Sequence, residues 1–532
     1  MTRNLLRKLA LCGIASAVTT ALIAGCGGAD KNGSDGAANI KDTVKVAVNA
    51  QPDSYDISKT TSTLARQMML GNVYEMLVTF DENYKVVPEL AEKIDVSEDA
   101  TRYTYHLRKG VKFHNGNEMK ADDVVASMNR WIDGNSQAKK ATGGAYFEKV
   151  DDYTVKVQMS KPSLMLNDLI AGINPAPIIV PKSTIDKADP KTHMITDYIG
   201  TGPYKVAEIK PDNYVRLEKF DNYQPYGDKG KVSGWSGYKE AKTKDVEFDF
   251  VLDPSTRVSG MQSGEYDMAI RLPVDQYSIF KNNNDYKVFR EDCGDMFLCY
   301  NKKQGLASNP KIRQAVNAVL NDDDILTAAV ADKDFYELKS SYVQNKNNKW
   351  YADTGNNWYN THNPERARAL LAEAGYNGET FNILVSSSYQ EFYNAAVVIK
   401  SELESIGVKT NLQVVDWATF LGTRKDPSQY DAFITGSPIV TVPNQILYIS
   451  STWDGWSADD HLQSTLQSIA TSNNLDEAIS SWKDLQKYCW EEYVPASKFG
   501  DYFALDVASG KVKDTVFFDC LLYTSPSPRD AQ

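Results

Sequence analysis

The sequence predicts an α/β protein that is divided into more than one lobe. The first observation is a helix–strand–helix–strand run between residues 363 and 415, in which helices cross between neighbouring strands as they do over a sheet with parallel pairs. The second is the length of 532 residues, which exceeds what one hydrophobic core usually supports. The third is a globular composition, with 42% hydrophobic and 24% charged residues. We therefore expect two or three domains or lobes.

The N-terminal segment is typical of an exported protein. A basic start that ends at Lys8 precedes an apolar run up to Ile23, which is shorter than the about 20 residues of a membrane-spanning helix. We interpret residues 1–25 as a signal peptide. The run leads into Ile-Ala-Gly-Cys, which resembles a bacterial lipobox, so we expect Cys26 to be lipidated; the alternative is an ordinary secretory signal in which this cysteine is incidental. The Gly-rich residues 26–39 would then form a flexible tether.

The first half of the body begins with strand and helix signals. Thr43–Val48 alternates as a strand does, and the loop 49–55 after it is a candidate cleft wall, because ligand sites of α/β sheets gather at strand ends. Alternation at Tyr103–Leu107 predicts another strand, which a Lys-Gly turn joins to a strand at Val111–Phe113 in a hairpin. An amphipathic helix is expected from Ala121 to Trp131, with acidic residues near its positive end.

The second half contains the clearest strand–helix–strand pattern. An Asn-Pro pair at 363–364 caps a helix that a glycine ends at 375. A strand at 381–385 follows, then a helix over 392–406, then a strand at 409–415. Apolar residues recur on one face of both helices, which indicates that each packs against a core.

Charge and cysteine content narrow the function. A formal net charge of −12 argues against nucleic acid as a partner, because phosphate binding needs clustered Lys and Arg. Cys293, Cys299 and Cys489 belong to the body, so at most one internal disulfide can form; free buried thiols are the alternative that we favour. Residues 520–532 are a Ser-Pro-rich tail that we expect to be non-native or disordered.

The sequence offers no recognisable set of catalytic or metal-ligating residues. It contains no G-x-S-x-G elbow, no H-E-x-x-H pair and no Walker loop. His461 and its two acidic neighbours are most simply a solvated face, and the three consecutive acids at 322–324 lack the alternate spacing of a calcium loop. We therefore predict a protein that is not an enzyme, with no catalytic residue, no cofactor and no metal site.

Several motifs, taken in order, resemble one family. Residues 87–92, 103–116 and 121–124 resemble the signature block of the extracytoplasmic solute-binding proteins of ABC importers, in the oligopeptide-, dipeptide- and nickel-binding class called family 5. The resemblance covers residues 40–519. Further matching motifs follow in the same order, at 200–204, 263–267, 309–315 and 363–376.

The resemblance implies a two-lobed, periplasmic-binding-protein-like (type II) α/β fold with a hinge. Its chain crossings would lie near Asp292–Lys302 and Ala496–Leu505, and the lobes would close on a solute. The implied division is a first lobe at 40–82, 198–292 and 496–519, an extra subdomain of that lobe at 83–197, and a second lobe at 293–495.

The resemblance also suggests which residues contact the solute. Trp417 and Arg424 match a segment in which peptide-binding relatives place a cleft tryptophan and an arginine, so Trp417 could stack on a ligand and Arg424 could pair with a carboxylate. The alternatives are a core anchor for Trp417 and a surface ion pair for Arg424. The other candidates are aromatic: Tyr55, Tyr300, Trp453 and Trp456.

One departure from the family bears on the identity of the solute. Peptide-binding relatives carry an aspartate that holds the peptide's α-ammonium, whereas residues 436–443 contain no acid. A buried ammonium without a partner costs several kcal/mol, so binding through that contact is in doubt. Glu291, Asp292 and Asp295 could supply the charge, although solvation is their simpler role.

Together these observations predict an importer subunit. We expect it to capture a small solute, with a peptide-like one favoured, and to deliver it to an ABC permease and ATPase. A different solute, such as a metal chelate or another small organic molecule, and a surface receptor or adhesin on the same fold are the alternatives. The protein is expected to be an extracytoplasmic monomer that the lipid on Cys26 anchors to the cell membrane.

Overall fold

The computed structural model describes residues 41–60, 62–513, 516–518, 521–523 and 527–528. The predicted signal peptide, Cys26 and the tether lie outside the described residues, as does much of the predicted tail. Within the described part, no helix combines the length and the apolar character that crossing a membrane requires.

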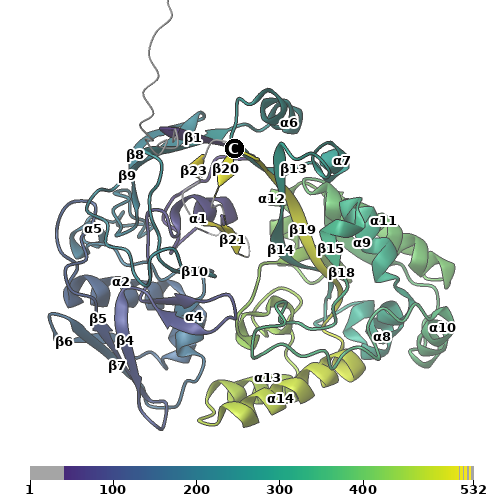
Figure 1. The fold of residues 1–532 in the computed structure, drawn as a ribbon. Helices are drawn as coiled ribbons and strands as arrows, with labels where there is room; N and C mark the ends of the chain where they lie inside the picture. Colours follow the sequence, from purple (N-terminus) through teal and green to yellow (C-terminus); the bar gives the residue numbers. More distant parts are fainter. Residues whose placement is uncertain (1–40, 61, 514–515, 519–520, 524–526, 529–532) are drawn as a thin grey trace, which may run out of the picture. The chain divides into compact units, whose positions relative to one another are not determined.

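One large mixed sheet organises the body (Figure 1). The order of its strands is β17-β16-β18-β14-β19-β13-β1-β12-β9-β8, and β15 pairs with β19 beside this path. Parallel pairs join β1 to β12 and β13, and β16 to β17 and β18. The bounds are β1 (Thr43–Val48), β8 (Tyr204–Lys210), β9 (Tyr214–Lys219), β12 (Asp245–Phe250), β13 (Met268–Leu272), β14 (Tyr286–Tyr300), β15 (Tyr336–Glu337), β16 (Phe381–Ser386), β17 (Thr410–Val415), β18 (Ala432–Ser437) and β19 (Ala496–Ser509).

Smaller sheets accompany it. A four-stranded antiparallel sheet has the order β4-β5-β7-β6, and α2 packs on β6 and β7. Its strands are β4 (Ala91–Val96), β5 (Arg102–Leu107), β6 (Phe147–Asp151) and β7 (Thr154–Gln158). The remaining strands form pairs: β2 (Val78–Phe80) with β3 (Val86–Pro88), β10 (Val232–Ser233) with β11 (Ser236–Gly237), β20 (Val512–Lys513) with β23 (Ser527–Pro528), and β21 (Val516–Phe518) with β22 (Leu521–Tyr523).

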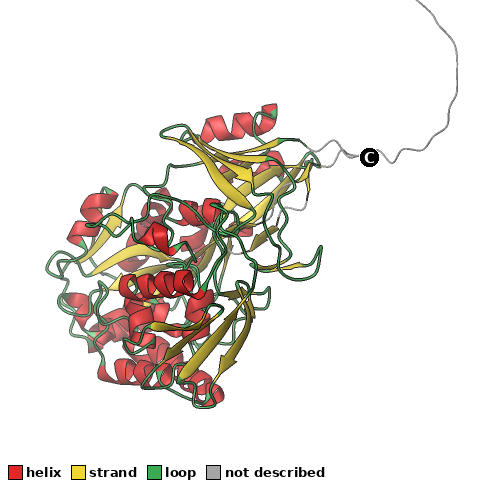
Figure 2. Ribbon diagram, turned by 90° about the vertical axis from the view of Figure 1, so that its left-hand side faces the viewer, coloured by secondary structure: helices red, strands yellow, loops and turns green. Residues whose placement is uncertain are grey.

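Helices and strands are mixed throughout the body, as an α/β fold requires (Figure 2). In the second half, α11 packs on β16 and β17, and α9 packs on β19. The helices are α1 (Thr63–Met69), α2 (Ala121–Gly134), α3 (Ser136–Ala141), α4 (Leu166–Ala171), α5 (Lys182–Ile185), α6 (Pro254–Ser263), α7 (Tyr277–Phe280), α8 (Pro310–Val319), α9 (Asp322–Val330), α10 (Pro364–Glu373), α11 (Gln390–Ser405), α12 (Trp417–Thr423), α13 (Asp460–Ala470) and α14 (Leu475–Tyr488). The described residues also form short 3₁₀ helices, η1 (Val274–Gln276), η2 (Leu306–Ser308), η3 (Lys333–Phe335), η4 (Pro443–Gln445) and η5 (Leu447–Ile449), and one π-helix, η6 (Cys489–Tyr493).

Two long antiparallel strands join the two halves of the large sheet. β14 pairs with β19 from Tyr286, opposite Ser509, to Cys299, opposite Ala496. On the other edge of each strand, β19 pairs with β13 and β14 pairs with β18. The register of the pair shifts between Asp292 and Asp295 and again after Met296. These shifts fall at the predicted chain crossings; the lobe boundaries themselves stay a prediction.

Most of the predicted elements are present at the predicted places. The strand at 43–48 is β1, the helix from Ala121 is α2, and Asn363 caps α10 by accepting a hydrogen bond from the Arg366 backbone. The strand–helix–strand pattern that follows is β16, α11 and β17.

The predicted hairpin is wrong. β5 pairs with β4 on one edge and with β7 on the other, so both of its edges are occupied and no edge remains for Val111–Phe113. That segment instead forms a single bridge between Lys112 and Glu118. Alternation identified the strand β5, but it could not identify its partners.

Candidate functional site

The main candidate site is a cavity of about 780 Å³, here called the cleft cavity. Its volume lies within the range of typical small-molecule sites, roughly 300–1,000 Å³. Five parallel-paired strands lead into its lining near their carboxyl ends, as is usual in α/β sheets. Asn49 follows β1, Arg271 lies in β13, Tyr389 follows β16, Trp417 follows β17, and Ser437 ends β18.

Part of the cavity lining is aromatic. The Trp417 ring lies 4.8 Å from the Tyr389 ring and stacks on Phe420 at 5.0 Å, with an angle of 11° between the planes. Tyr389 also lies 5.3 Å from Phe392, which lines the cavity with Tyr502. Trp417 is half-buried and Tyr389 is 38% exposed, so ring surface remains accessible to a solute.

Arg271 is the more exposed of two arginines in the lining; the other is the buried Arg66 of α1. The guanidinium of Arg271 donates from Nη2 to Oε1 of Glu291 at 2.7 Å and from Nε to Oε2 at 3.2 Å. Glu291 is fully buried, whereas 35% of the Arg271 side chain is exposed. The carboxylate therefore holds the arginine from its buried side.

Cys293 lines the cavity close to this pair. Burial raises the pKa of its thiol well above the ordinary value, which makes it a poor nucleophile at neutral pH. Cys293, Cys299 and Cys489 are all free thiols in the structure, which is the favoured one of the two alternatives that the sequence left open.

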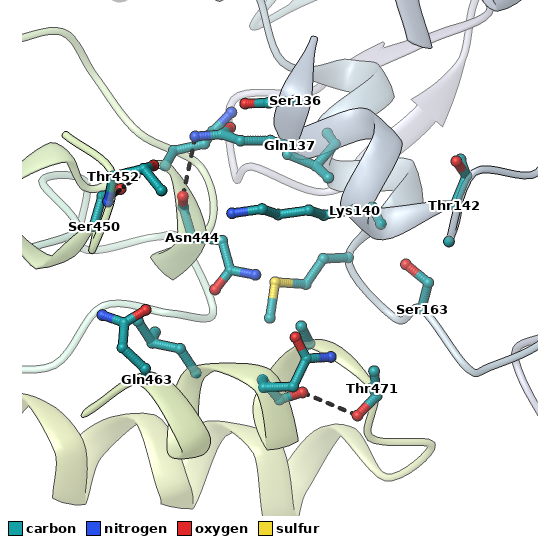
Figure 3. A pocket seen from close by; sticks show the side chains of 18 of the residues that line it. Ser136, Gln137, Lys140, Thr142, Ser163, Asn444, Ser450, Thr452, Gln463 and Thr471 are labelled. Carbon is teal, nitrogen blue, oxygen red and sulfur yellow. Dashed lines mark hydrogen bonds between the residues drawn. The ribbon is translucent and has the colours of Figure 1, made fainter. Parts of the chain in front are cut away.

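A second cavity of about 560 Å³, here called the side chamber, shares lining residues with the cleft cavity. Both are lined by Gln137, whose side-chain amide donates to the carbonyl oxygen of Asn444 at 3.0 Å (Figure 3). Lys140 extends into the chamber in the same view, and Trp453 belongs to its lining. The Gln137–Asn444 hydrogen bond thus lies at the junction of the two spaces.

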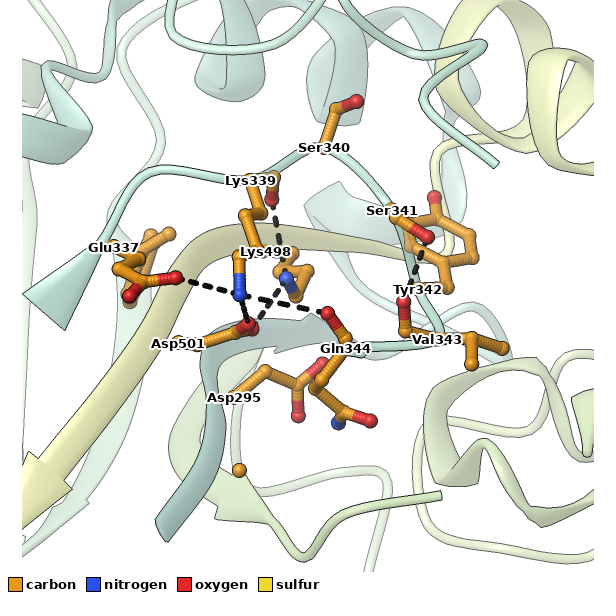
Figure 4. A network of polar contacts seen from close by, with 12 residues as sticks. Asp295, Glu337, Lys339, Ser340, Ser341, Tyr342, Val343, Gln344, Lys498 and Asp501 are labelled. Atoms are coloured by element: carbon orange, nitrogen blue, oxygen red, sulfur yellow. Dashed lines mark hydrogen bonds and ion pairs between the residues drawn. The ribbon is translucent and has the colours of Figure 1, made fainter. Parts of the chain in front are cut away.

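An ionic network lies at the joining strands; it is buried at Lys498 and Asp501 and partly exposed at Lys339 and Glu337 (Figure 4). Lys498 donates to Asp501 at 2.8 Å, and Lys339 pairs with Asp501 at 2.9 Å and with Glu337 at 2.7 Å. Asp295 lies next to this network, and burial raises the pKa of its carboxyl to about 7. The expectation that Asp295 and Glu291 are solvated is wrong, because both are buried inside the sheet.

The structure separates the predicted contact residues. Trp417 lies in the cleft cavity and Trp453 in the side chamber. Arg424 pairs with Asp454, with 2.6 Å between Nε and Oδ2, and its guanidinium lies 5.0 Å from the centre of the Trp453 ring. Arg424 therefore forms an ion pair, as in the alternative considered for it, but the pair is largely buried and not on the surface.

The other three aromatic candidates lie outside the lining of both cavities. Tyr55 is 4% exposed and packs edge-on against Tyr198, and burial raises its pKa to about 12. Tyr300 is buried in the sheet and shares a 2.6 Å hydrogen bond with Ser497. Trp456 lies under the ammonium of Lys303, 5.4 Å from the ring centre.

Sequence reasoning missed Arg271, Arg66 and Tyr389. The loop after β1 was correctly placed beside a cavity, since Asn49 and Ala50 line it. One feature of the sequence could have indicated Arg271, because this arginine interrupts the otherwise apolar strand Met-Ala-Ile-Arg-Leu. A charge within a buried strand needs a partner or a ligand.

Comparison with known proteins adds three findings. The family model described as bacterial extracellular solute-binding proteins, family 5 (middle), matches residues 85–457. A relative from Sinorhizobium fredii, named "Probable peptide ABC transporter periplasmic-binding protein", is 28% identical over 471 residues, which cover 84% of this chain and 86% of the relative. A glutathione-binding protein of Escherichia coli is 25% identical over 505 residues, covering 90% and 91% of the two chains.

Solved structures match over most of the chain. The binding protein AgaA of A. tumefaciens, in complex with agropinic acid, has a TM-score of 0.74 and 26% identity, covering 90% of this chain and 95% of its own. A dipeptide-binding protein of Pseudoalteromonas in complex with Met-Leu has a TM-score of 0.75 and 20% identity, covering 92% and 100%. These matches confirm the predicted two-lobed, type II binding-protein fold class.

Proposed function

The chain belongs to the bacterial extracellular solute-binding proteins, family 5, and we propose that it captures a peptide-like solute in the cleft cavity for an ABC importer. The observation that carries this proposal is the position of the cavity. It lies at the carboxyl ends of strands from both halves of the large sheet, so one solute would contact both halves. Side-chain amides of Asn49, Asn135 and Gln137 supply hydrogen bonds suited to a peptide backbone.

Lobe closure is the proposed means of capture. A solute that contacts both halves only when they meet shifts the population towards the closed state. The joining strands β14 and β19 would bend at their register shifts, near Asp292–Asp295 and Gly500. With this bend we propose the division that the family implies: a first lobe at 40–82, 198–292 and 496–519, its extra subdomain at 83–197, and a second lobe at 293–495.

A solute other than a peptide is the second candidate. Segment 436–443 carries no acid to hold an α-ammonium, and the relative AgaA is named as a complex with agropinic acid. The family's role is solute binding in transport, and we expect no turnover of the bound solute.

Native mass spectrometry of protein purified from its host tests the proposed function. We expect a captured small molecule whose mass fits a peptide or peptide-like compound, and its removal and return should change tryptophan fluorescence through Trp417. A captured mass with no amide bond on fragmentation would replace the peptide-like solute by the second candidate. Unchanged fluorescence and X-ray scattering across a broad panel of peptides and chelates would contradict closure.

We further propose that the protein is a monomer tethered to the membrane by a lipid on Cys26, next to a permease and an ATPase. The support is the lipobox-like sequence before Cys26 together with the extracytoplasmic role of the family. Cys26→Ser should release the protein from membranes into the soluble fraction, because serine lacks the thiol through which the lipid is attached. Equal membrane retention of both forms, with no lipid on either, would refute the anchor.

A further inference from the structure

The lining of the cleft cavity has an unequal distribution of charge. Among the described residues that line it, the charged side chains are Arg66 and Arg271, and none is an aspartate or a glutamate. A cationic group that entered the closed cavity would have no carboxylate beside it, and an unpaired buried charge costs several kcal/mol. An anionic group would meet arginine instead, which is the side chain best shaped to bind carboxylates.

The backbone at Arg271 departs from regular strand geometry. The residue has a φ of 49°, in the left-handed region that favours glycine, and it lies where the register of β13 on β19 shifts. Its backbone N–H donates to Oδ1 of Asp506 at 2.8 Å. Nine other described non-glycine residues also have a positive φ, so this strain marks a local distortion of β13 and does not by itself indicate a ligand site.

The guanidinium keeps one edge for a ligand. Glu291 engages Nε and Nη2 from the buried side, and none of the hydrogen bonds between described residues uses Nη1. Burial raises the pKa of Asp506 well above its ordinary value, which favours its neutral form, so the counter-charge of Arg271 is Glu291. Glu291 lies outside the lining of the cavity, so Arg271 presents its guanidinium, and no carboxylate, to a solute there.

We infer that the solute carries a carboxylate that binds Arg271 in the cleft cavity, and that its recognition does not depend on a free ammonium group. The inference rests on the proposed function, because it assumes that the cleft cavity holds the solute. It narrows the substrate class to carboxylates, including N-blocked peptides and amino-acid conjugates. The pair Arg271–Glu291 then acts as a prearranged clamp whose arginine is already held in position when the solute arrives.

Matched ligand mixtures test the inference on the unaltered protein. After the captured solute has been removed, the protein is offered four equimolar mixtures. The first three contain dipeptides with free ends, the same dipeptides N-acetylated, and the same dipeptides C-amidated. The fourth contains sugar–amino acid conjugates in both acid and amide forms. Native mass spectrometry and competition titration give relative affinities. We expect free and N-acetylated dipeptides to bind within a few-fold of each other, and amides to bind at least tenfold more weakly than acids.

The outcomes separate this inference from the proposed function. Amides that bind as well as acids, a tenfold loss on N-acetylation, or no binding from any carboxylate mixture would overturn the inference. Binding confined to the acid form of the conjugates would support the carboxylate assignment while contradicting the peptide-like solute.

A pair of double variants then locates the carboxylate. Arg271→Gln alone would leave Glu291 buried without its partner and could unfold the chain, so the variant is Arg271→Gln with Glu291→Gln. It should lose the preference for acid over amide. The matched control is Lys311→Gln with Glu373→Gln, an exposed pair 2.9 Å apart between α8 and α10, which should keep the preference. A tenfold preference that survives in the first double variant would overturn the role of Arg271.

Discussion

Asp295 carries its carboxyl inside the sheet, where it is 1% exposed. Oδ2 accepts a hydrogen bond from the Tyr448 hydroxyl at 3.3 Å, and Lys498 and Asp501 lie nearby. An aspartate in water has a pKa of about 3.9, so a value of about 7 means that the folded protein holds a proton that the unfolded chain releases.

This proton makes stability depend on pH in a defined direction. Between about pH 4 and pH 7 this carboxyl binds more protons in the folded state than in the unfolded chain, so its contribution to stability falls as pH rises through this window and levels off above it. Asp295→Asn should flatten that slope and should be more stable than the wild type at pH 8, by at most about 4 kcal/mol. Urea denaturation at pH 5 and pH 8 measures both effects.

Asp484→Asn, on the exposed face of α14, is the control and should leave the slope unchanged. Equal slopes for Asp295→Asn and the wild type would show that this carboxyl ionises with its ordinary pKa in the folded protein.

Among the elements, β14 and β18 approach unusually closely at Gly294. A Cβ added there would lie 1.9 Å from the carbonyl oxygen of Ser437, and the residue has a φ of 87°. No side chain fits this gap without moving one of the strands. The register shift beside Gly294 therefore depends on glycine.

Gly294→Ala should lower the free energy of unfolding by about 3 kcal/mol or more, because it adds a backbone clash to the strain of a positive φ. Gly116→Ala isolates the strain, since Gly116 has a φ of 85° with no atom within 4 Å of the added Cβ, and about 1 kcal/mol is expected there. Chemical denaturation compares the two. Equal losses would mean that the strands at Gly294 separate without cost.

Local patterns predicted these elements better than their partners. The caps of α10, the apolar face of α11 and the alternation of β1 are written into neighbouring residues, and each element formed where expected. The pairing of β5 with β7 joins residues about 50 positions apart, and local alternation contains no information about it.

Local sequence patterns were also insufficient to identify all residues of the candidate site. Trp417 was a candidate because its segment resembles one in which peptide-binding relatives place a cleft tryptophan, whereas Arg271 became a candidate only when β13, β14 and β19 were seen side by side. The acid-free segment at 436–443 was visible in the sequence, but the arginines that line the same cavity were not.

In the molecule as a whole, few polar contacts join the region of the small sheet to the second half of the chain. Lys349 pairs with Asp168 at 2.8 Å, and the Thr441 hydroxyl donates to the Asp168 carbonyl at 3.4 Å. Asp168 is 3% exposed, and this burial raises its pKa. The pair thus connects the predicted subdomain to the predicted second lobe.

Lys349→Met should therefore weaken solute binding by tenfold or more without touching the cleft cavity. Under the proposed lobe closure, the pair forms when the lobes meet and separates when they part. The variant would then leave the carboxyl of Asp168 buried without its partner in the closed state, so the closed population and the apparent affinity would both fall. Isothermal titration with the captured solute measures the loss. Lys182→Met breaks an exposed pair between the first residue of α5 and Asp186, which follows the helix, and serves as the control. Equal affinities in both variants would contradict the role in closure.

The hydrogen bond between Gln137 and Asn444 has a consequence for the length of the cargo. It lies at the junction between a space of about 780 Å³ and one of about 560 Å³, and a single neutral hydrogen bond contributes only about 1 kcal/mol. A short solute fits in the first space with the bond intact. Under the proposed function, a longer one would have to displace the Gln137 amide to reach the second space, so the upper size limit of the solute would depend on the residues that line both spaces, Gln137 among them.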